Sequence, residues 1–94
     1  MSRSEPRLPL SLKPLSVVRK IVLLPQAAED LDAIQEPLYS EILRKIRLLQ
    51  DFPQLGAVMQ EAFQGYRSLV AAPFRVIYRI ASEDRIEVAY IFSL

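Results

Sequence analysis

Hydrophobic and polar residues alternate along the C-terminal third of the chain with the period of two that is typical of β-strands. Three such segments cover residues 66–70, 74–80 and 86–92. Short turns separate them, at residues 71–73 and 81–85. The pattern predicts an antiparallel meander of three strands in which one face packs on a hydrophobic core and the other stays open.

The middle segment shows best which side chains would share a face, because successive residues of a strand point to opposite sides. The face expected to pack on the core carries Phe74, Val76, Tyr78 and Ile80. The opposite face carries Arg75, Ile77 and Arg79. The open side of the sheet is therefore expected to be basic.

The N-terminal half of the domain changes from strand to helix at Pro25. Residues 17–24 are rich in β-branched and aliphatic side chains and predict a first strand, and proline is favoured at the first position of a helix. A short helix is expected next, with Ala27, Leu31 and Ile34 on its apolar face and Glu29, Asp30 and Asp32 facing away. A break at residues 35–37 and a second apolar stripe up to about residue 52 complete a helical hairpin. Residues 57–64 are expected to form an irregular connection.

The order β-α-α-β-β-β predicts an α+β fold, with the helical hairpin packed on one face of a twisted, mainly antiparallel sheet. The chain has 94 residues, 51% of them hydrophobic, which suits a single domain over residues 17–94. Residues 1–16 hold three of the seven prolines and are expected to form a flexible N-terminal arm.

Composition removes several classes of chemistry. The chain has neither cysteine nor histidine, so disulfides, thiolate nucleophiles, Cys/His zinc sites and imidazole-dependent triads are excluded. Two glycines are too few for a phosphate-binding or dinucleotide loop. We expect no cofactor and no metal. Apolar runs are far shorter than the roughly 20 residues of a membrane span, and no secretory signal is visible, so a cytoplasmic location is expected.

Arginines on the strands are the candidate functional residues. Twelve basic and eleven acidic residues give a net charge of +1, so only a local concentration of cations would attract a nucleic acid. Arg67, Arg75 and Arg79 are expected to share a patch on or beside the open side, with Arg19 and Lys20 as neighbours. Arginine binds phosphate oxygens bidentately and stays charged. Ordinary solvation of a half-exposed strand explains the same alternation, and periodicity alone favours it.

Four segments together resemble the RelE/ParE superfamily of bacterial type II toxins, over residues 17–92. They are LLPQAAEDLDAI, LLQDFPQLG, GYRSLVAAPFRVIYRI and IEVAYIF. The third segment carries the most specific signal, a Gly-Tyr-Arg strand followed by a Phe-Arg-Val-Ile-Tyr strand. The resemblance implies a microbial RNase-like α+β fold and a cognate antitoxin as partner.

Two activities are known on this fold. RelE-like members cut ribosome-bound mRNA with basic residues, and ParE-like members inhibit DNA gyrase without nuclease activity. The spacing from Ala27 to Pro53 is closer to RelE. The resemblance then implies a metal-independent endoribonuclease, in which Arg67 and Arg75 stabilise charge on the phosphate while Lys20 and Arg79 bind the substrate.

The C-terminus departs from the family pattern. RelE-like toxins usually continue past the last strand into a basic tail with a further arginine and a tyrosine, whereas this sequence ends at Leu94. Two alternatives to a ribosome-dependent mRNA endonuclease therefore stand: a ParE-like gyrase inhibitor, and a degenerate toxin that only binds its antitoxin.

Overall fold

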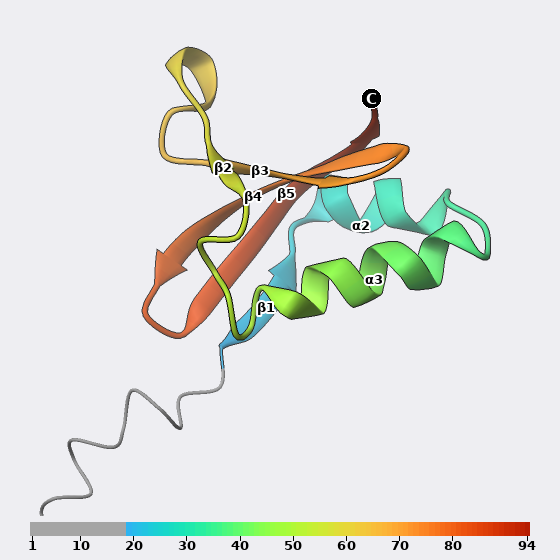
Figure 1. Ribbon diagram of the computed structural model, residues 1–94, viewed down its shortest axis with the longest axis horizontal. Coiled ribbons are helices and arrows are strands. Elements are labelled where there is room, and N and C mark those ends of the chain that lie inside the picture. The colour runs from blue at the N-terminus through green and yellow to red at the C-terminus, as the bar shows by residue number, and fades with distance from the viewer. Residues whose placement is uncertain (1–18) are drawn as a thin grey trace, which may run out of the picture.

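A computed structural model describes residues 19–94, which form one five-stranded sheet with two helices on one side (Figure 1). In chain order the elements are β1 (Lys20–Leu23), α2 (Pro25–Asp32), α3 (Leu38–Leu48), β2 (Ala57–Val58), the 3-10 turn η1 (Glu61–Phe63), β3 (Arg67–Ala71), β4 (Phe74–Ser82) and β5 (Arg85–Ser93). The expectation of an N-terminal arm falls on residues 1–16, which lie outside the described residues.

The strand order in the sheet is β1-β5-β4-β3-β2, with β1 parallel to β5 and every other pair antiparallel. This confirms the predicted β-α-α-β-β-β arrangement. It adds β2, which the sequence analysis placed in an irregular connection. A strand of two residues is too short to show an alternating pattern in the sequence. It forms because Ala57 and Val58 pair with Ser68 and Arg67 on β3.

The hydrophobic core lies between the helices and the sheet. Buried side chains come from α2, α3, β3, β4 and β5 and include Ala27, Leu31, Ile42, Ile46, Leu69, Val76, Tyr78, Ile86 and Val88. Phe74 packs against this cluster, so three of the four β4 residues predicted on this face are confirmed there. The fourth, Ile80, pairs with the core residue Ile86 but is itself 37% exposed.

Helix α2 begins with Pro25 at its first position, as predicted. Its acidic residues do not all face away, however. Asp30 accepts a hydrogen bond from the backbone N–H of Ile91 at 3.0 Å. Strand β1 ends at Leu23, opposite Val88, so the edge of β5 beyond that point lacks a strand partner on this side. The Asp30 carboxylate supplies one of the missing acceptors.

A β-bulge in β5 determines which of its side chains reach the open face. Ile77 pairs with Tyr90 and Tyr78 pairs with Val88, which leaves Ala89 without a partner on β4. One extra residue shifts the alternation by one position. Tyr90 therefore lies on the side away from the helices, together with Ile77.

Among residues 19–94, no helix is long and apolar enough to cross a membrane.

Candidate functional site on the open face of the sheet

The four basic residues predicted as a site do not lie together. Arg75 and Arg79 alternate with the core residues of β4 and lie on the open face. Arg67 pairs with the core residue Tyr78, so it lies on the helix-facing side. Lys20 is on β1, which is separated from β4 by β5. The expectation of a shared patch is therefore wrong for Arg67.

The reason lies in the pairing of β3 with β4. Arg67 and Leu69 are two residues apart on β3 and share a face, and Leu69 belongs to the core. The sequence motif shows that both strands contain an arginine, but not that the two arginines point to opposite sides. Only the register, Arg67 opposite Tyr78 and Val70 opposite Arg75, decides this.

Arg67 and Tyr78 together hold the loop that follows α3. The Arg67 guanidinium donates to the carbonyl of Gly56 at 2.8 Å and, more weakly, to that of Gln54 at 3.4 Å. The Tyr78 hydroxyl donates to the carbonyl of Pro53 at 2.7 Å and accepts from the N–H of Gly56 at 2.9 Å. Burial raises the pKa of Tyr78, against the opposing effects of the Gly56 hydrogen bond and the Arg67 charge. The Arg67 side chain therefore holds the loop that follows α3 against the sheet.

Arg75 has a different environment. Its Nε atom is buried and has no hydrogen-bond partner within the described part of the chain. The residues opposite it on the neighbouring strands are Val70 and Phe92, which are 47% and 45% exposed. Arg75 therefore sits among exposed apolar side chains with a donor that is still unsatisfied.

Arg79 is already engaged by an internal carboxylate. Its Nε and Nη2 atoms both contact Oε1 of Glu87, at 2.9 and 2.8 Å, and Nε of Arg85 donates to Oε2 of Glu87 at 2.8 Å. The hydrogen bonds from Arg85 and Arg79 lower the pKa of Glu87, and the same carboxylate raises the pKa of Arg79. The Arg79 guanidinium also lies 5.9 Å from the ring centroid of Tyr66. We call Arg79, Arg85 and Glu87 the ion cluster.

Aromatic side chains cover the middle of the open face. Ile77 is 0% exposed although it does not belong to the helix-facing core. The connection between β2 and β3 rises on the side of the sheet away from the helices (Figure 1). From it, Phe63 makes edge-to-face contacts with Tyr66 and Tyr90, at centroid distances of 6.4 and 6.3 Å. A second, smaller apolar cluster thus lies between Arg75 and the ion cluster.

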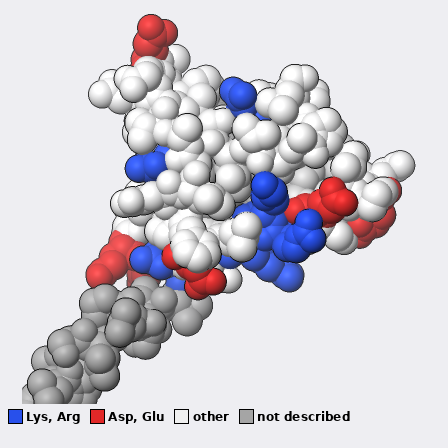
Figure 2. All heavy atoms as spheres, viewed as in Figure 1, with Lys and Arg blue, Asp and Glu red and all other residues white. Residues whose placement is uncertain are grey.

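The densest basic region in view lies elsewhere. Figure 2 shows basic side chains as separate spots over the strands and as a group over α3. The basic residues of α3 are Arg44, Lys45 and Arg47. On the open face, Arg79 and Arg85 are both bound to Glu87, so the positive charge there is partly neutralised.

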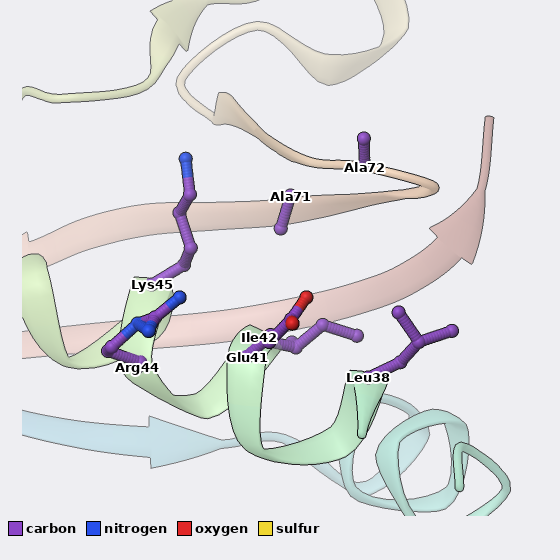
Figure 3. A pocket seen from close by; sticks show the side chains of 7 residues that line it. All are labelled: Leu38, Glu41, Ile42, Arg44, Lys45, Ala71 and Ala72. Atoms are coloured by element: carbon purple, nitrogen blue, oxygen red, sulfur yellow. The ribbon is translucent and has the colours of Figure 1, made fainter. Parts of the chain in front are cut away.

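The surface has one small cavity and one larger, open groove that matter for the choice of a site. The one between α3 and the β3–β4 turn has a volume of about 60 Å³ and is lined by Ile42, Lys45, Ala71 and their neighbours, with Ala71 pointing toward the helix (Figure 3). This volume suits a few water molecules rather than a substrate. Within residues 19–94, Asp and Glu side chains form no group of three that could hold a metal ion.

A larger groove, of about 560 Å³, lies between the α2–α3 turn and the ends of β4 and β5. Its walls are largely apolar, from Ile34, Leu38, Phe74, Ile91 and Phe92, and Asp30 and Glu36 give it an acidic margin. Phe92 belongs both to this groove and to the surface around Arg75.

Sequence reasoning missed the residues that give the open face its character. Tyr90 and Glu87 fall on opposite faces in a strictly alternating strand, and the bulge at Ala89 brings both to the open side. Arg85 begins β5, whereas the sequence pattern predicts it in the turn before that strand. No local signal indicates that Phe63, in an irregular stretch, folds over the sheet.

Comparison with known proteins supports one family. The family model described as the ParE toxin of the type II toxin-antitoxin system parDE matches residues 21–93. No curated protein sequence is significantly similar to the chain.

Solved toxin structures share the fold. A chain of the RelBE2 complex of Mycobacterium tuberculosis superimposes with a TM-score of 0.75 and 17% identity, over 83% of this chain and 100% of that one. A chain of the chromosomal ParDE system of P. aeruginosa gives a TM-score of 0.69 and 22% identity, over 84% and 99%. A chain of the E. coli RelBE complex gives 0.67 and 11%, over 81% and 96%. With a family model that spans nearly all of the described domain, the chain belongs to the ParE toxins of type II toxin-antitoxin systems, within the RelE/ParE superfamily.

Proposed function

We propose that this toxin arrests growth by docking its open face on a protein target, with DNA gyrase as the first candidate, and that it does not cut RNA. The observation that carries the proposal is the environment of Arg75. It is a half-buried arginine with a free donor, flanked on the neighbouring strands by the exposed side chains of Val70 and Phe92, and Tyr90 lies two residues before Phe92 on the same face.

This composition is typical of the centre of a protein interface. Tyrosine, phenylalanine and arginine are enriched there, and the residues that dominate binding energy are buried aromatics and arginines. An arginine Nε that is shielded from water gains most from an acceptor supplied by a partner, because leaving it unpaired costs free energy. Docking would satisfy Arg75 and cover the apolar side chains at the same time.

The geometry fits the nuclease mechanism less well. Attack of a ribose 2′-OH on a phosphate needs stabilisation of the developing charge and a group that accepts a proton. Arg67 lies on the other side of the sheet and binds backbone carbonyls, and the fork of Arg79 is bound to Glu87. The pKa of Glu87 is lowered, so its carboxylate is a weak base. Lys20 is two strands away from Arg75.

A cognate antitoxin is the second partner that we propose. Structures with the same fold come from toxin-antitoxin systems. An amphipathic antitoxin segment that covered Phe92, which joins the groove to the Arg75 surface, would block docking on the target.

A ribosome-dependent mRNA endonuclease is the alternative function. It is favoured by the same free donor of Arg75, which is suited to a phosphate oxygen. In that case the charge that builds on the phosphate would be stabilised by Arg75 without help from Arg67. A degenerate toxin that only binds an antitoxin is the third reading, and it predicts no effect on growth.

One induction experiment separates the three functions. The toxin is expressed without an antitoxin, growth is followed, mRNA 5′ ends are mapped, and gyrase-linked DNA breaks are quantified. We expect growth arrest with gyrase-linked breaks and no new mRNA ends. Arrest with new 5′ ends inside codons would establish the endonuclease, and unchanged growth would establish the degenerate toxin.

A further inference from the structure

On the open face, the carboxylate of Glu87 bridges the guanidinium groups of Arg79 and Arg85. We propose that Glu87 occupies the place of a phosphate between Arg79 and Arg85 and thereby suppresses nucleic-acid binding by this end of the face. This inference rests on the proposed function, in which the open face is the contact surface and its target is a protein. Glu87 is then a specificity-determining residue.

The contacts of Glu87 are those of a bound oxyanion. One carboxylate oxygen meets both Nε and Nη2 of Arg79, and the other meets Nε of Arg85, at distances of 2.8 to 2.9 Å. The Nε–Nη2 edge is the part of arginine that binds a phosphate bidentately. While Glu87 binds this edge of Arg79, a phosphate in solution has to displace a carboxylate that belongs to the same chain.

The two arginines would stay close to each other without Glu87. Arg79 pairs directly with Glu87 across β4 and β5, and Arg85 lies two residues from Glu87 on the same strand. The Tyr66 ring, which lies under the Arg79 guanidinium, supports its position independently of the carboxylate. The side chains of Arg79 and Arg85 are 47% and 43% exposed, so ligands in solution have access to them.

Electrostatics gives the expected sign. Two arginines and one carboxylate carry a net charge of +1, and replacing Glu87 by a neutral residue raises this to +2 while freeing the Arg79 fork. Each phosphate contact on a single strand adds about 0.7 to the slope of log affinity against log salt concentration. If a contact contributes nothing at 1 M salt, a gain of one to two contacts corresponds to about five- to twenty-five-fold tighter binding at 0.1 M salt.

The test compares two substitutions with the same charge change. Glu87→Gln keeps the size of the side chain, and Glu83→Gln removes a carboxylate from an exposed position in the β4–β5 turn. Binding of a fluorescent single-stranded oligoribonucleotide to the purified toxin is measured by anisotropy over a range of salt concentrations. We expect the affinity of Glu87→Gln at 0.1 M salt to rise about five- to twenty-five-fold, with a steeper salt dependence, and that of Glu83→Gln to change less than about twofold. Equal effects of the two substitutions, or weaker binding by Glu87→Gln, would overturn the proposal.

A second comparison, of Arg79→Ala in the wild-type and Glu87→Gln backgrounds, tests the masking of Arg79 directly. In the wild-type background, Arg79→Ala should change oligoribonucleotide affinity less than about twofold, because the masked arginine contributes little. In the Glu87→Gln background, Arg79→Ala should remove most of the gain. An equal loss in both backgrounds would contradict the closed site. Because the readout is binding, a failure of the proposed gyrase target shows in the growth experiment and not here.

Discussion

Arg67 and Arg75 lie on two neighbouring strands but have opposite environments. The donors of Arg67 and the hydroxyl of Tyr78 meet backbone groups of the loop over residues 53–56. Arg75 has a buried Nε without a partner and exposed apolar neighbours. One arginine has its hydrogen bonds supplied by the protein itself, and the other has a donor available to something else.

A basic residue in a family motif therefore need not belong to the working surface. A satisfied buried network stabilises the fold, and an unsatisfied donor on an apolar surface stabilises a complex. We therefore expect changes in the first region to lower the free energy of unfolding. Changes in the second region should alter activity and leave stability almost unchanged.

The largest expected effect on stability is that of Gly56→Ala. An added Cβ would lie 2.7 Å from Cε1 of Tyr78 and 2.9 Å from the carbonyl oxygen of Ser68, and neither a packed ring nor a paired strand can move away cheaply. We expect the free energy of unfolding to fall by about 1–3 kcal/mol or more, measured by denaturant titration. A loss below about 0.5 kcal/mol would show that the loop is not held tightly against Tyr78.

Tyr78→Phe is expected to lower the free energy of unfolding by about 1–3 kcal/mol, because it leaves the carbonyl of Pro53 and the N–H of Gly56 without their partner. It also tests a pH dependence. The pKa of Tyr78 is raised in the folded protein, so the neutral phenol stabilises the fold below the ordinary tyrosine value of about 10, and this contribution is lost as the pH rises further.

Melting temperatures between pH 8 and about 11 would measure this effect. We expect the wild type to lose more stability on the alkaline side than Tyr78→Phe does. Parallel curves for the two proteins would show that the hydroxyl is not held as described.

Arg67→Ala should have a smaller effect, about 0.5–1.5 kcal/mol, because the principal loss is one short hydrogen bond to the carbonyl of Gly56. Arg67→Lys, which retains one donor, is the matched control and should recover part of the loss. Both variants should still arrest growth when enough folded protein is present. A fully stable Arg67→Ala toxin without activity would move Arg67 back to the working surface.

The sequence was a good guide where its period was long and unbroken. The strands β3 and β4 and the helix that begins at Pro25 follow from local patterns, as does the position of Phe74, Val76 and Tyr78 against the helices. The candidate site was harder to predict because it depends on pairing between strands. The register places Arg67 on the helix-facing side, and the bulge at Ala89 determines the neighbours of Arg75 and Arg79.

The covering of the open face was not accessible to sequence reasoning for a related reason. Phe63 reaches Tyr90 only because the connection between β2 and β3 folds over the sheet, and nothing in residues 57–64 alone specifies that path. The occupied state of Arg79 likewise depends on a carboxylate eight residues away that faces it across β4 and β5.

Growth after induction of Arg75→Ala, compared with the wild type at equal amounts of folded protein, tests most directly whether the open face is the working surface. Arg75 contributes no hydrogen bond from Nε to the fold, so the melting temperature should stay within a few degrees of the wild-type value. We predict that Arg75→Ala no longer arrests growth. Undiminished growth arrest by a stably folded Arg75→Ala toxin would contradict the assignment of the open face as the working surface.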